Sequence, residues 1–256
     1  MRIARVSVPG VEFPVYGVIT GEKIELITGL PWPDISDPVA ALNLADVKIL
    51  APVIPSKIVG VGKNYADHAK EMGGDVPAEP VIFLKPNTTV IGDGDFIVLP
   101  PQSTNVHHEA ELAIIIGALA KNVEVDRADE VIFGYTCAND VTARDLQNSD
   151  LQWTRSKSFD TFCPLGPWIE TEFVPKDQKI TATLNGEVKQ SSVLSEMIFK
   201  IPQIIEFVTN VMTLLPGDVI LTGTPAGIGP MPAGASISVE IEGLGTLTNK
   251  VSPRVQ

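Results

Sequence analysis

The chain is short of cysteine, of long apolar runs and of basic residues, and each shortage narrows what it can be. Cys137 and Cys163 are its only cysteines, too few for a disulfide framework, so we expect a protein of the reducing cytoplasm. No apolar run approaches the roughly 20 residues of a membrane span, and the first residues are typical of a strand rather than a signal peptide. Nineteen basic against 31 acidic residues give a net charge of −12, which argues against nucleic acid and anionic membranes as partners.

Several catalytic signatures are missing as well. There is no Gly-x-Ser-x-Gly elbow, and neither cysteine has a base nearby in sequence that would mark a nucleophile. Covalent catalysis by serine or cysteine is therefore not expected. The Gly-rich segment Thr222–Gly229 matches neither the Walker nor the dinucleotide spacing, which argues against a nucleotide site.

Strand-like segments outnumber helical ones, and this predicts an α+β fold that is predominantly β. Residues 1–50 are typical of a small β-rich unit, and residues 51–56 are typical of a linker. We therefore divide the 256 residues into a β-rich N-terminal extension, residues 1–54, and a main domain, residues 55–256.

Local signals place several elements in the main domain. Asn185-Gly186 between two strand-like runs is the strongest hairpin signal of the chain. Residues 86–106, rich in Pro, Gly and Asp, are expected to pair as irregular hairpins. A short helix is expected from Tyr65 to Met72 with Asn64 as its cap, and a longer helical stretch over residues 192–212, with Pro202 as the first residue of its second segment.

The central feature of the sequence is a pair of glutamates, Glu109 and Glu111, at the start of the apolar run Leu112–Ile116. Side chains two apart on a strand share a face, so these two lie about 6–7 Å apart at Cα. Ionised groups are rarely buried without a partner, and a divalent cation is the simplest one. Asp140 would complete a set of oxygen ligands that suits Mg²⁺, Mn²⁺ or Ca²⁺ and disfavours Zn²⁺. The alternative is that both glutamates face water and that Asp140 caps a helix.

A second feature is the pair His68 and Glu71, three residues apart on one face of the expected short helix. A carboxylate beside an imidazole orients the ring and raises its basicity, as a water-activating general base requires. Gly73-Gly74 would let this helix move as a lid. The alternative is an exposed pair on a surface helix.

Further polar residues follow in the same half of the chain. Lys157 lies in an aperiodic loop and could stabilise an enolate or a carboxylate, or could simply be solvated. Arg144 and Gln147 stand one turn apart after Asp140 and would project near the metal, although Arg144 could instead pair with Asp140 or Asp145. Two adjacent histidines, at positions 107 and 108, point to opposite faces of a strand, so both cannot easily ligate one ion.

The hydroxyl of Thr224 and the Gly-rich backbone around it could hold an anion. With Thr224 included, the candidate site residues extend over most of the main domain. Each segment that carries them is a weak functional signal alone, but the order and spacing of the segments along the chain form a combined pattern.

Seven segments stand in the order and spacing of the fumarylacetoacetate hydrolase family. They are GVGKNYADHAKE, EPVIFLKP, HHEAELAIIIG, GYTCANDVTARDLQ, RSKSFDTFCPLGPW, LLPGDVILTGTPAGIG and a final G-x-L-x-N. The chain resembles this family from Pro55 to Val251. The resemblance implies a mixed β-sandwich roll that is usually dimeric and that holds Mg²⁺ or Mn²⁺. The carboxylates that match its metal ligands are Glu109, Glu111 and Asp140.

The resemblance also implies roles for the other candidates. The His–Glu dyad of the acylpyruvate-cleaving members matches His68 and Glu71 on a mobile lid, and the lysine of their K-S-F segment matches Lys157. The residues implied to bind substrate are Lys85, Arg144, Gln147 and Thr224. The first 54 residues resemble the short extension of bacterial members rather than the SH3-like domain of the founding enzymes, which argues against fumarylacetoacetate itself as substrate.

The implied activity is cleavage of a C–C bond in a small 2-keto acid through a metal-bound enolate. Acylpyruvates would be hydrolysed, and oxaloacetate would be decarboxylated, both to pyruvate. Isomerisation or decarboxylation of diacids of the 2-hydroxyhepta-2,4-diene-1,7-dioate type is the alternative, and ureidoglycolate cleavage is a weaker one. A sensor that binds metal and keto acid without turnover is a further alternative. We expect a homodimeric, Mg²⁺- or Mn²⁺-dependent hydrolase or decarboxylase.

Overall fold

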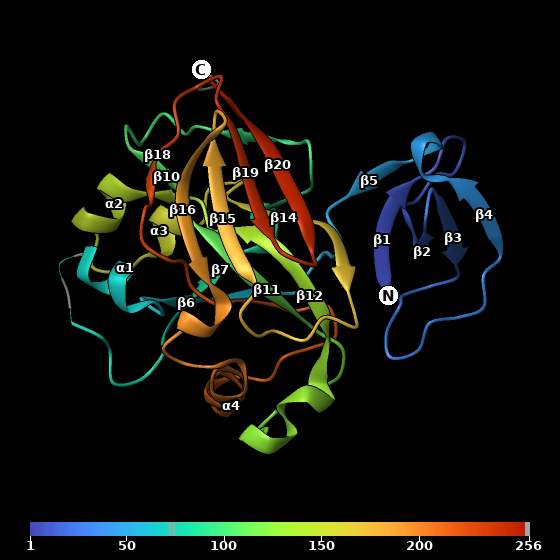
Figure 1. The fold of residues 1–256 in the computed structure, drawn as a ribbon, viewed down its shortest axis with the longest axis horizontal. Coiled ribbons are helices and arrows are strands. Elements are labelled where there is room, and N and C mark those ends of the chain that lie inside the picture. The colour runs from blue at the N-terminus through green and yellow to red at the C-terminus, as the bar shows by residue number, and fades with distance from the viewer. Residues whose placement is uncertain (72, 74, 254–256) are drawn as a thin grey trace.

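The computed structural model describes residues 1–71, 73 and 75–253. Its largest element is a mixed β-sheet that runs through both parts of the molecule (Figure 1). Across the sheet lie β4 (Ala40–Asn43), β3 (Lys23–Ile27), β2 (Val15–Thr20), β1 (Arg2–Ser7), β14 (Cys163–Glu170), β12 (Ile132–Asn139), β11 (Ala110–Ile116), β17 (Val219–Leu221), β6 (Ile58–Gly62) and β7 (Val81–Lys85), with β5 (Lys48–Leu50) on β1 and β8 (Val90–Ile91) on β14. Every residue of β11 is buried, as its unbroken apolar run predicts.

Two smaller sheets complete the β structure. One consists of β16 (Glu187–Val193), β15 (Lys179–Leu184), β19 (Ser236–Ile241), β20 (Gly245–Ser252) and β9 (Phe96–Val98). The other consists of β13 (Thr142–Ala143), β10 (Val106–His108) and β18 (Gly229–Pro230). Apolar side chains of β11 and β12 share one buried cluster with those of β15, β19 and β20, so two sheets face each other across a core. The prediction of a mostly β, sandwich-like α+β fold is confirmed.

The helices are few and short. They are α1 (Ala66–Glu71), α2 (Arg144–Ser149), α3 (Thr154–Lys157), α4 (Ile201–Val211) and the 3₁₀ turns η1 (Leu44–Asp46), η2 (Asn87–Thr89), η3 (Val125–Val131) and η4 (Leu194–Glu196). Within the described part of the chain, none of them is long and apolar enough to cross a membrane. Only α4 buries a full apolar stripe, through Ile204, Ile205 and Val208.

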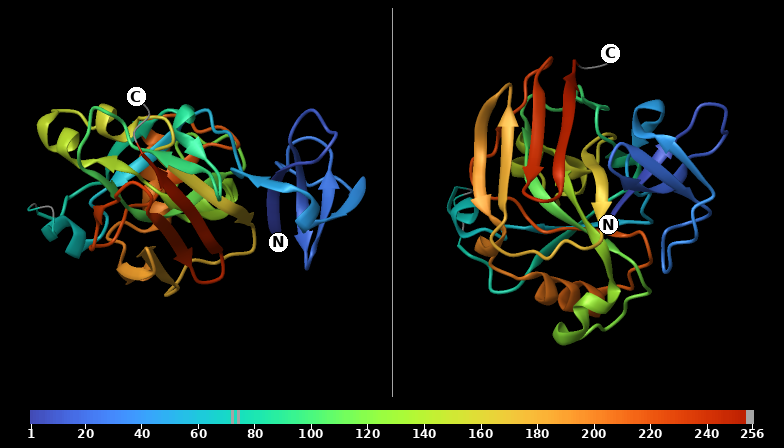
Figure 2. Two further views of the ribbon diagram at one scale, coloured as in Figure 1. Left: turned by 90° about the horizontal axis from the view of Figure 1, so that it is seen from above. Right: turned by 45° about the vertical axis from the view of Figure 1, so that its right-hand side comes forward.

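The first five strands form a small lobe beside the main body (Figures 1 and 2). The lobe joins the large sheet where β1 pairs antiparallel with β14, with Arg2 opposite Glu170 and Ile3 opposite Ile169. Trp32 packs edge-to-face on Tyr16 in β2. It also packs edge-to-face on Phe133 in β12, so one aromatic side chain connects the lobe to the main body.

Three local predictions are wrong, and tertiary contacts explain each. The first half of the helical stretch expected over residues 192–212 is wrong, because β16 continues through Val193 in register with β15, whereas the second segment expected from Pro202 is confirmed as α4, which begins at Ile201. Residues 86–106 do not pair as hairpins, because β8 pairs with β14 and β9 with β20, both in parallel.

Asn64 is not a helix cap. Its side-chain amide donates to the backbone carbonyls of Thr222 and Phe199, and its Oδ1 accepts from the Phe199 N–H. Asn64 therefore ties the start of the α1 segment to β17. The expected end of this helix at Met72 and the expected hinge at Gly74 lie outside the described residues.

Candidate active site

Three buried carboxylates meet where β11 begins and β12 ends. The antiparallel register sets Ala110 opposite Asn139, so Glu109 and Asp140 lie side by side, and the Asp140 N–H donates to the Glu109 carbonyl at 2.9 Å. Glu111 extends from the same strand. One oxygen from each of the three side chains lies within 4.8 Å of the others. The structure thus brings together the three predicted metal ligands, and none of them faces bulk water.

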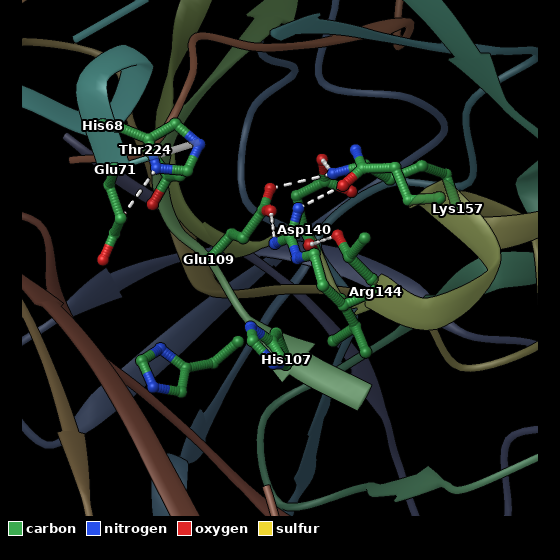
Figure 3. Close-up of polar contacts among 12 residues, drawn as sticks. His68, Glu71, His107, Glu109, Asp140, Arg144, Lys157 and Thr224 are labelled. Atoms are coloured by element: carbon green, nitrogen blue, oxygen red, sulfur yellow. Dashed lines mark hydrogen bonds and ion pairs between the residues drawn. The ribbon is translucent and has the colours of Figure 1, made fainter. Parts of the chain in front are cut away.

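Three buried cations neutralise two of these carboxylates (Figure 3). Lys157 Nζ lies 2.8 Å from Glu109 Oε2 and 2.5 Å from Asp140 Oδ2. Lys85 Nζ lies 2.5 Å from Asp140 Oδ1. Arg144 pairs with Glu109 rather than with a neighbouring aspartate. Lys157 is therefore not a solvated loop lysine, because it ends helix α3 and is buried against the carboxylates.

This arrangement gives the two glutamates opposite pKa shifts. Burial alone would raise the pKa of Glu109, but the adjacent Lys157 and Arg144 cations outweigh it and hold the pKa well below its ordinary value. Burial raises the pKa of Glu111, and the negative charges of Asp140 and Glu109 raise it further. Of the three carboxyls, Glu111 is thus the one without a cationic side chain paired to it among the described residues.

The cluster fits a divalent cation. Ligands that lie about 2.0–2.6 Å from one ion are at most about 5 Å apart, which the three carboxylates satisfy. All the donors are oxygen atoms, as Mg²⁺ and Mn²⁺ prefer. The Glu111 carboxylate accepts a hydrogen bond from the Gly223 N–H at 2.6 Å, which fixes its direction and leaves its second oxygen for an ion.

The predicted dyad forms on α1. His68 Nδ1 lies 3.1 Å from Glu71 Oε2, and Glu71 Oε1 accepts from the Gly227 N–H at 3.1 Å. His68 is buried rather than exposed. Figure 3 shows the dyad on one side of Glu109 and Lys157 on the other, so a molecule at the carboxylates would have an imidazole and an ammonium on opposite sides.

One small cavity connects the candidates. Eight of the ten predicted residues line it, namely His68, Glu109, Glu111, Asp140, Arg144, Gln147, Lys157 and Thr224. The other two, Glu71 and Lys85, reach it through His68 and Asp140. Phe83 and Trp153 form an edge-to-face wall. The cavity measures about 30 Å³, the room of no more than a few water molecules, so a keto acid needs more space than the cavity has in this conformation.

Thr224 lies at the cavity with its hydroxyl already engaged. The hydroxyl donates to the Ala110 carbonyl at 2.9 Å and accepts from Gln190 Nε2 at 2.7 Å. Its proton is thus unavailable to an anion in this conformation. The sequence analysis missed Gln190, a buried residue of the β15–β16 hairpin, because a lone glutamine after a turn carries no local signal. It also missed Lys63, which lines the cavity from the end of β6.

The two adjacent histidines point apart, as expected. His107 Nε2 lies 2.9 Å from Asn105 Oδ1, and His108 Nδ1 lies 3.0 Å from Gln190 Oε1. Burial and the nearby Arg144 lower the pKa of His107 to about 4. Neither histidine belongs to the metal-binding group found among the described residues.

Comparisons with known proteins identify the family of the chain. Residues 57–252 match the family described as fumarylacetoacetate (FAA) hydrolase C-terminal, and residues 1–52 match the one described as Rv2993c-like, N-terminal. Protein Rv2993c of Mycobacterium tuberculosis is 50% identical over 98% of this chain and 98% of its own length. The mitochondrial oxaloacetate tautomerase FAHD2A of Bos taurus is 44% identical over 82% of this chain and 71% of its own.

Solved structures are similar over the whole chain. The 5-carboxymethyl-2-hydroxymuconate delta-isomerase from Mycobacterium smegmatis has a TM-score of 0.93 at 46% identity and covers 99% of this chain and 100% of its own. The maleylpyruvate hydrolase from Sphingobium sp. SYK-6, in complex with manganese (II) ion and pyruvate, has a TM-score of 0.81 at 31% identity and covers 100% of both chains. The chain therefore belongs to the fumarylacetoacetate hydrolase family, whose members are enzymes.

Proposed function

We propose that the chain is a Mg²⁺- or Mn²⁺-dependent enzyme that cleaves a C–C bond in small 2-oxo acids, either hydrolysing acylpyruvates or decarboxylating oxaloacetate. One observation carries the proposal. Three carboxylates able to share an ion, a buried lysine and a His–Glu dyad surround a single cavity. A divalent ion held by the three carboxylates would polarise the keto oxygen of the substrate as a Lewis acid.

The side chains of this chain would supply the rest of the chemistry. Lys157, already placed by two carboxylates, lies where it can stabilise negative charge that develops on an enolate oxygen. Arg144 and Gln147, which contact each other, offer guanidinium and amide donors to the substrate carboxylate. His68, oriented by Glu71, can take a proton from water or move one at C3 of the substrate.

The substituent at C4 would decide the outcome. If C4 is a ketone, water activated by His68 attacks it, and the bond between C3 and C4 breaks to give a carboxylic acid and the enolate of pyruvate. If C4 is a carboxylate, CO₂ leaves and the same enolate forms. Protonation at C3 gives pyruvate in both cases, so one set of side chains serves two substrates.

A proton shift without cleavage is the second candidate. Two relatives at 44% and 46% identity are named an oxaloacetate tautomerase and a muconate-type isomerase. A proton shift needs a positioned acid–base group and no nucleophilic water, and His68, oriented by Glu71 at the cavity, supplies such a group. His68 would then move the proton between C3 and oxygen.

A substrate panel separates the two candidates. Oxaloacetate, acetylpyruvate, fumarylpyruvate and a 2-hydroxyhepta-2,4-diene-1,7-dioate diacid should be tested with Mg²⁺, with Mn²⁺ and with chelator. We expect metal-dependent release of pyruvate from at least one of the first three. Enol–keto interconversion without pyruvate release would favour the proton-shift candidate, and equal rates with chelator would overturn the metal-dependent mechanism.

A further inference from the structure

Lys63 occupies a position at the cavity that the proposed function leaves without a role. Strands β6 and β17 run parallel, and Gly60 is opposite Leu221. Lys63 follows directly after the end of β6 and Thr224 follows three residues after the end of β17, and both residues line the cavity. Because parallel neighbours end at the same edge, the two side chains belong to one rim of the site.

Lys63 differs from the other cations of the cavity in having no partner. Lys85, Lys157 and Arg144 are each paired with a buried carboxylate. Lys63 is half-buried and makes no ion pair and no hydrogen bond with any described residue. A partly desolvated ammonium at a cavity rim, with no protein anion beside it, is suited to an anion supplied from outside.

The backbone holds Lys63 in this position at a cost. Its φ of 56° lies in the left-handed region, which costs a non-glycine residue roughly 1 kcal/mol. The following residue is fixed, because the Asn64 side chain donates to the Thr222 carbonyl at 2.7 Å and accepts from the Phe199 N–H at 2.7 Å. A strained lysine rather than glycine at a cavity rim indicates that the side chain is used.

Charge balance indicates what kind of anion would bind. Counted together, the carboxylates of Glu71, Glu109, Glu111 and Asp140 are matched in number by the cations Lys63, Lys85, Arg144 and Lys157, so a divalent ion would leave two positive charges uncompensated. A dicarboxylate neutralises both, whereas a monocarboxylate leaves one. The first carboxylate of a 2-oxo acid belongs near the metal, so the second would extend towards the rim.

We propose that Lys63 binds the second carboxylate of a dicarboxylic 2-oxo acid, and that it makes the site selective for diacids such as oxaloacetate over neutral-tailed acylpyruvates. This inference rests on the proposed function. It makes Lys63 a specificity-determining residue, and it assigns the rim between the ends of β6 and β17 to the distal end of the substrate.

The test compares two substrates on three proteins. Wild type, Lys63→Met and Lys63→Arg are assayed with oxaloacetate and with acetylpyruvate at saturating Mg²⁺. A lost charge-assisted contact should lower the ratio of kcat/KM for oxaloacetate to that for acetylpyruvate roughly 10–100-fold in the Met variant, chiefly through KM. The Arg variant should keep most of the ratio. An unchanged ratio in Lys63→Met, or equal losses on both substrates, would overturn the proposal.

Two additional arms keep the outcome interpretable. Lys63→Gly removes both the charge and the backbone strain, so it should lose the ratio as the Met variant does while its Tm is no lower than that of wild type. If wild type turns over neither substrate, the proposed function fails. Lys63 is then judged by titrating the Mg²⁺-loaded protein with 3,3-difluorooxaloacetate, which cannot enolise, and with pyruvate. A preference for the diacid that Lys63→Met abolishes supports the proposal, and an equal preference in both proteins ends it.

Discussion

At the scale of single residues, the carboxylate cluster was predictable and its counter-charges were not. The alternation of Glu109 and Glu111 on a strand fixes their common face, so the sequence alone brings them together. Lys85 and Lys157 contact Asp140 from 55 and 17 residues away. Lys85 ends strand β7 and Lys157 ends helix α3, so tertiary packing brings these side chains to Asp140, and no local pattern encodes that packing. The sequence therefore predicts a site that needs positive charge, and the structure shows that side chains supply part of it.

Glu111→Ala should abolish tight Mn²⁺ binding and nearly all activity while the fold survives. The variant removes the carboxyl whose pKa burial and two neighbouring anions raise, so the metal-free protein should be as stable as wild type or slightly more stable. Isothermal titration and thermal melts measure both effects. The exposed Glu12→Ala serves as control, and full activity in Glu111→Ala would exclude a carboxylate metal site.

Metal binding should release a proton. Because the pKa of Glu111 is raised in the metal-free protein, its carboxyl carries, at any pH below that pKa, a proton that an ion must displace. The apparent affinity for Mn²⁺ should therefore rise with pH, by up to about tenfold per unit, and level off above that pKa. Titrations in two buffers of different ionisation enthalpy between pH 6 and 8 give the number of protons released. A value of zero throughout would contradict the shift.

At the scale of elements, local signals succeeded where contacts are local. The Asn185-Gly186 hairpin forms with both residues at positive φ, 52° and 83°, as the sequence predicts. The first half of the predicted 192–212 helical stretch is wrong because pairing of β16 with β15 outweighs its helical preference, whereas the second segment forms as α4. The parallel pairing of β8 with β14 and of β9 with β20 could not be predicted from local signals, since both partner strands follow much later in the chain.

Helix α1 carries His68, the proposed general base, so His68→Ala should separate the two proposed cleavage reactions. Acylpyruvate hydrolysis needs a water aimed at C4 and should fall roughly 10²–10⁴-fold. Oxaloacetate decarboxylation needs no nucleophilic water and should fall less. Both rates are measured on one purified sample at saturating Mg²⁺. Equal losses would mean that the dyad acts on lid closure or on a proton transfer common to both reactions.

Asp218 ties the linker to the start of β17, and this contact should make stability depend on pH. Burial alone would raise its pKa, but the Leu215 N–H, Lys57 and Ser56 lower it overall. A lowered carboxyl pKa stabilises the fold above the ordinary value near 4 and ceases to do so as pH falls through the folded value. Asp218→Asn should therefore cost about 2 kcal/mol at pH 7 and less below pH 4.

Urea unfolding of wild type and of Asp218→Asn between pH 7 and pH 3 measures the difference in their free energies of unfolding. The matched control is Asp177→Asn, since Asp177 is exposed and its loss should change stability by only a few tenths of a kcal/mol. A gap between wild type and Asp218→Asn that stays constant with pH would show that packing, not the carboxylate charge, accounts for the loss.

At the scale of the whole molecule, the N-terminal lobe is continuous with the catalytic body through the large sheet. The pairing of β1 with β14 means that neither strand is an exposed edge along that contact. Composition alone does suggest a separate unit at residues 1–54, but it cannot show this shared sheet, because the partner strand lies about 160 residues away. Association of two copies of the chain stays a prediction.

Trp32→Ala should loosen the lobe from the body without reaching the active site. The Trp32 ring centroid lies 5.9 Å from that of Tyr16 and 5.6 Å from that of Phe133, so its removal leaves a gap between the two parts. We expect a loss of about 3 kcal/mol and a lower Tm. Limited proteolysis should cut the lobe first, whereas kcat/KM at 25 °C should change less than about twofold because Tyr16 and Phe133, the two rings that Trp32 packs on, do not line the cavity.

The control for this change is Phe13→Ala, a similar truncation at a side chain that is 71% exposed, which should leave both Tm and the proteolysis pattern unchanged. If Trp32→Ala unfolds cooperatively at an unchanged Tm, the β1–β14 pairing alone holds the lobe in place. If instead kcat/KM falls together with Tm, the lobe supports the geometry of the active site through β12, which carries Phe133 near its start and leads directly into Asp140. The two outcomes distinguish a lobe that is merely attached from one that stabilises the metal ligands.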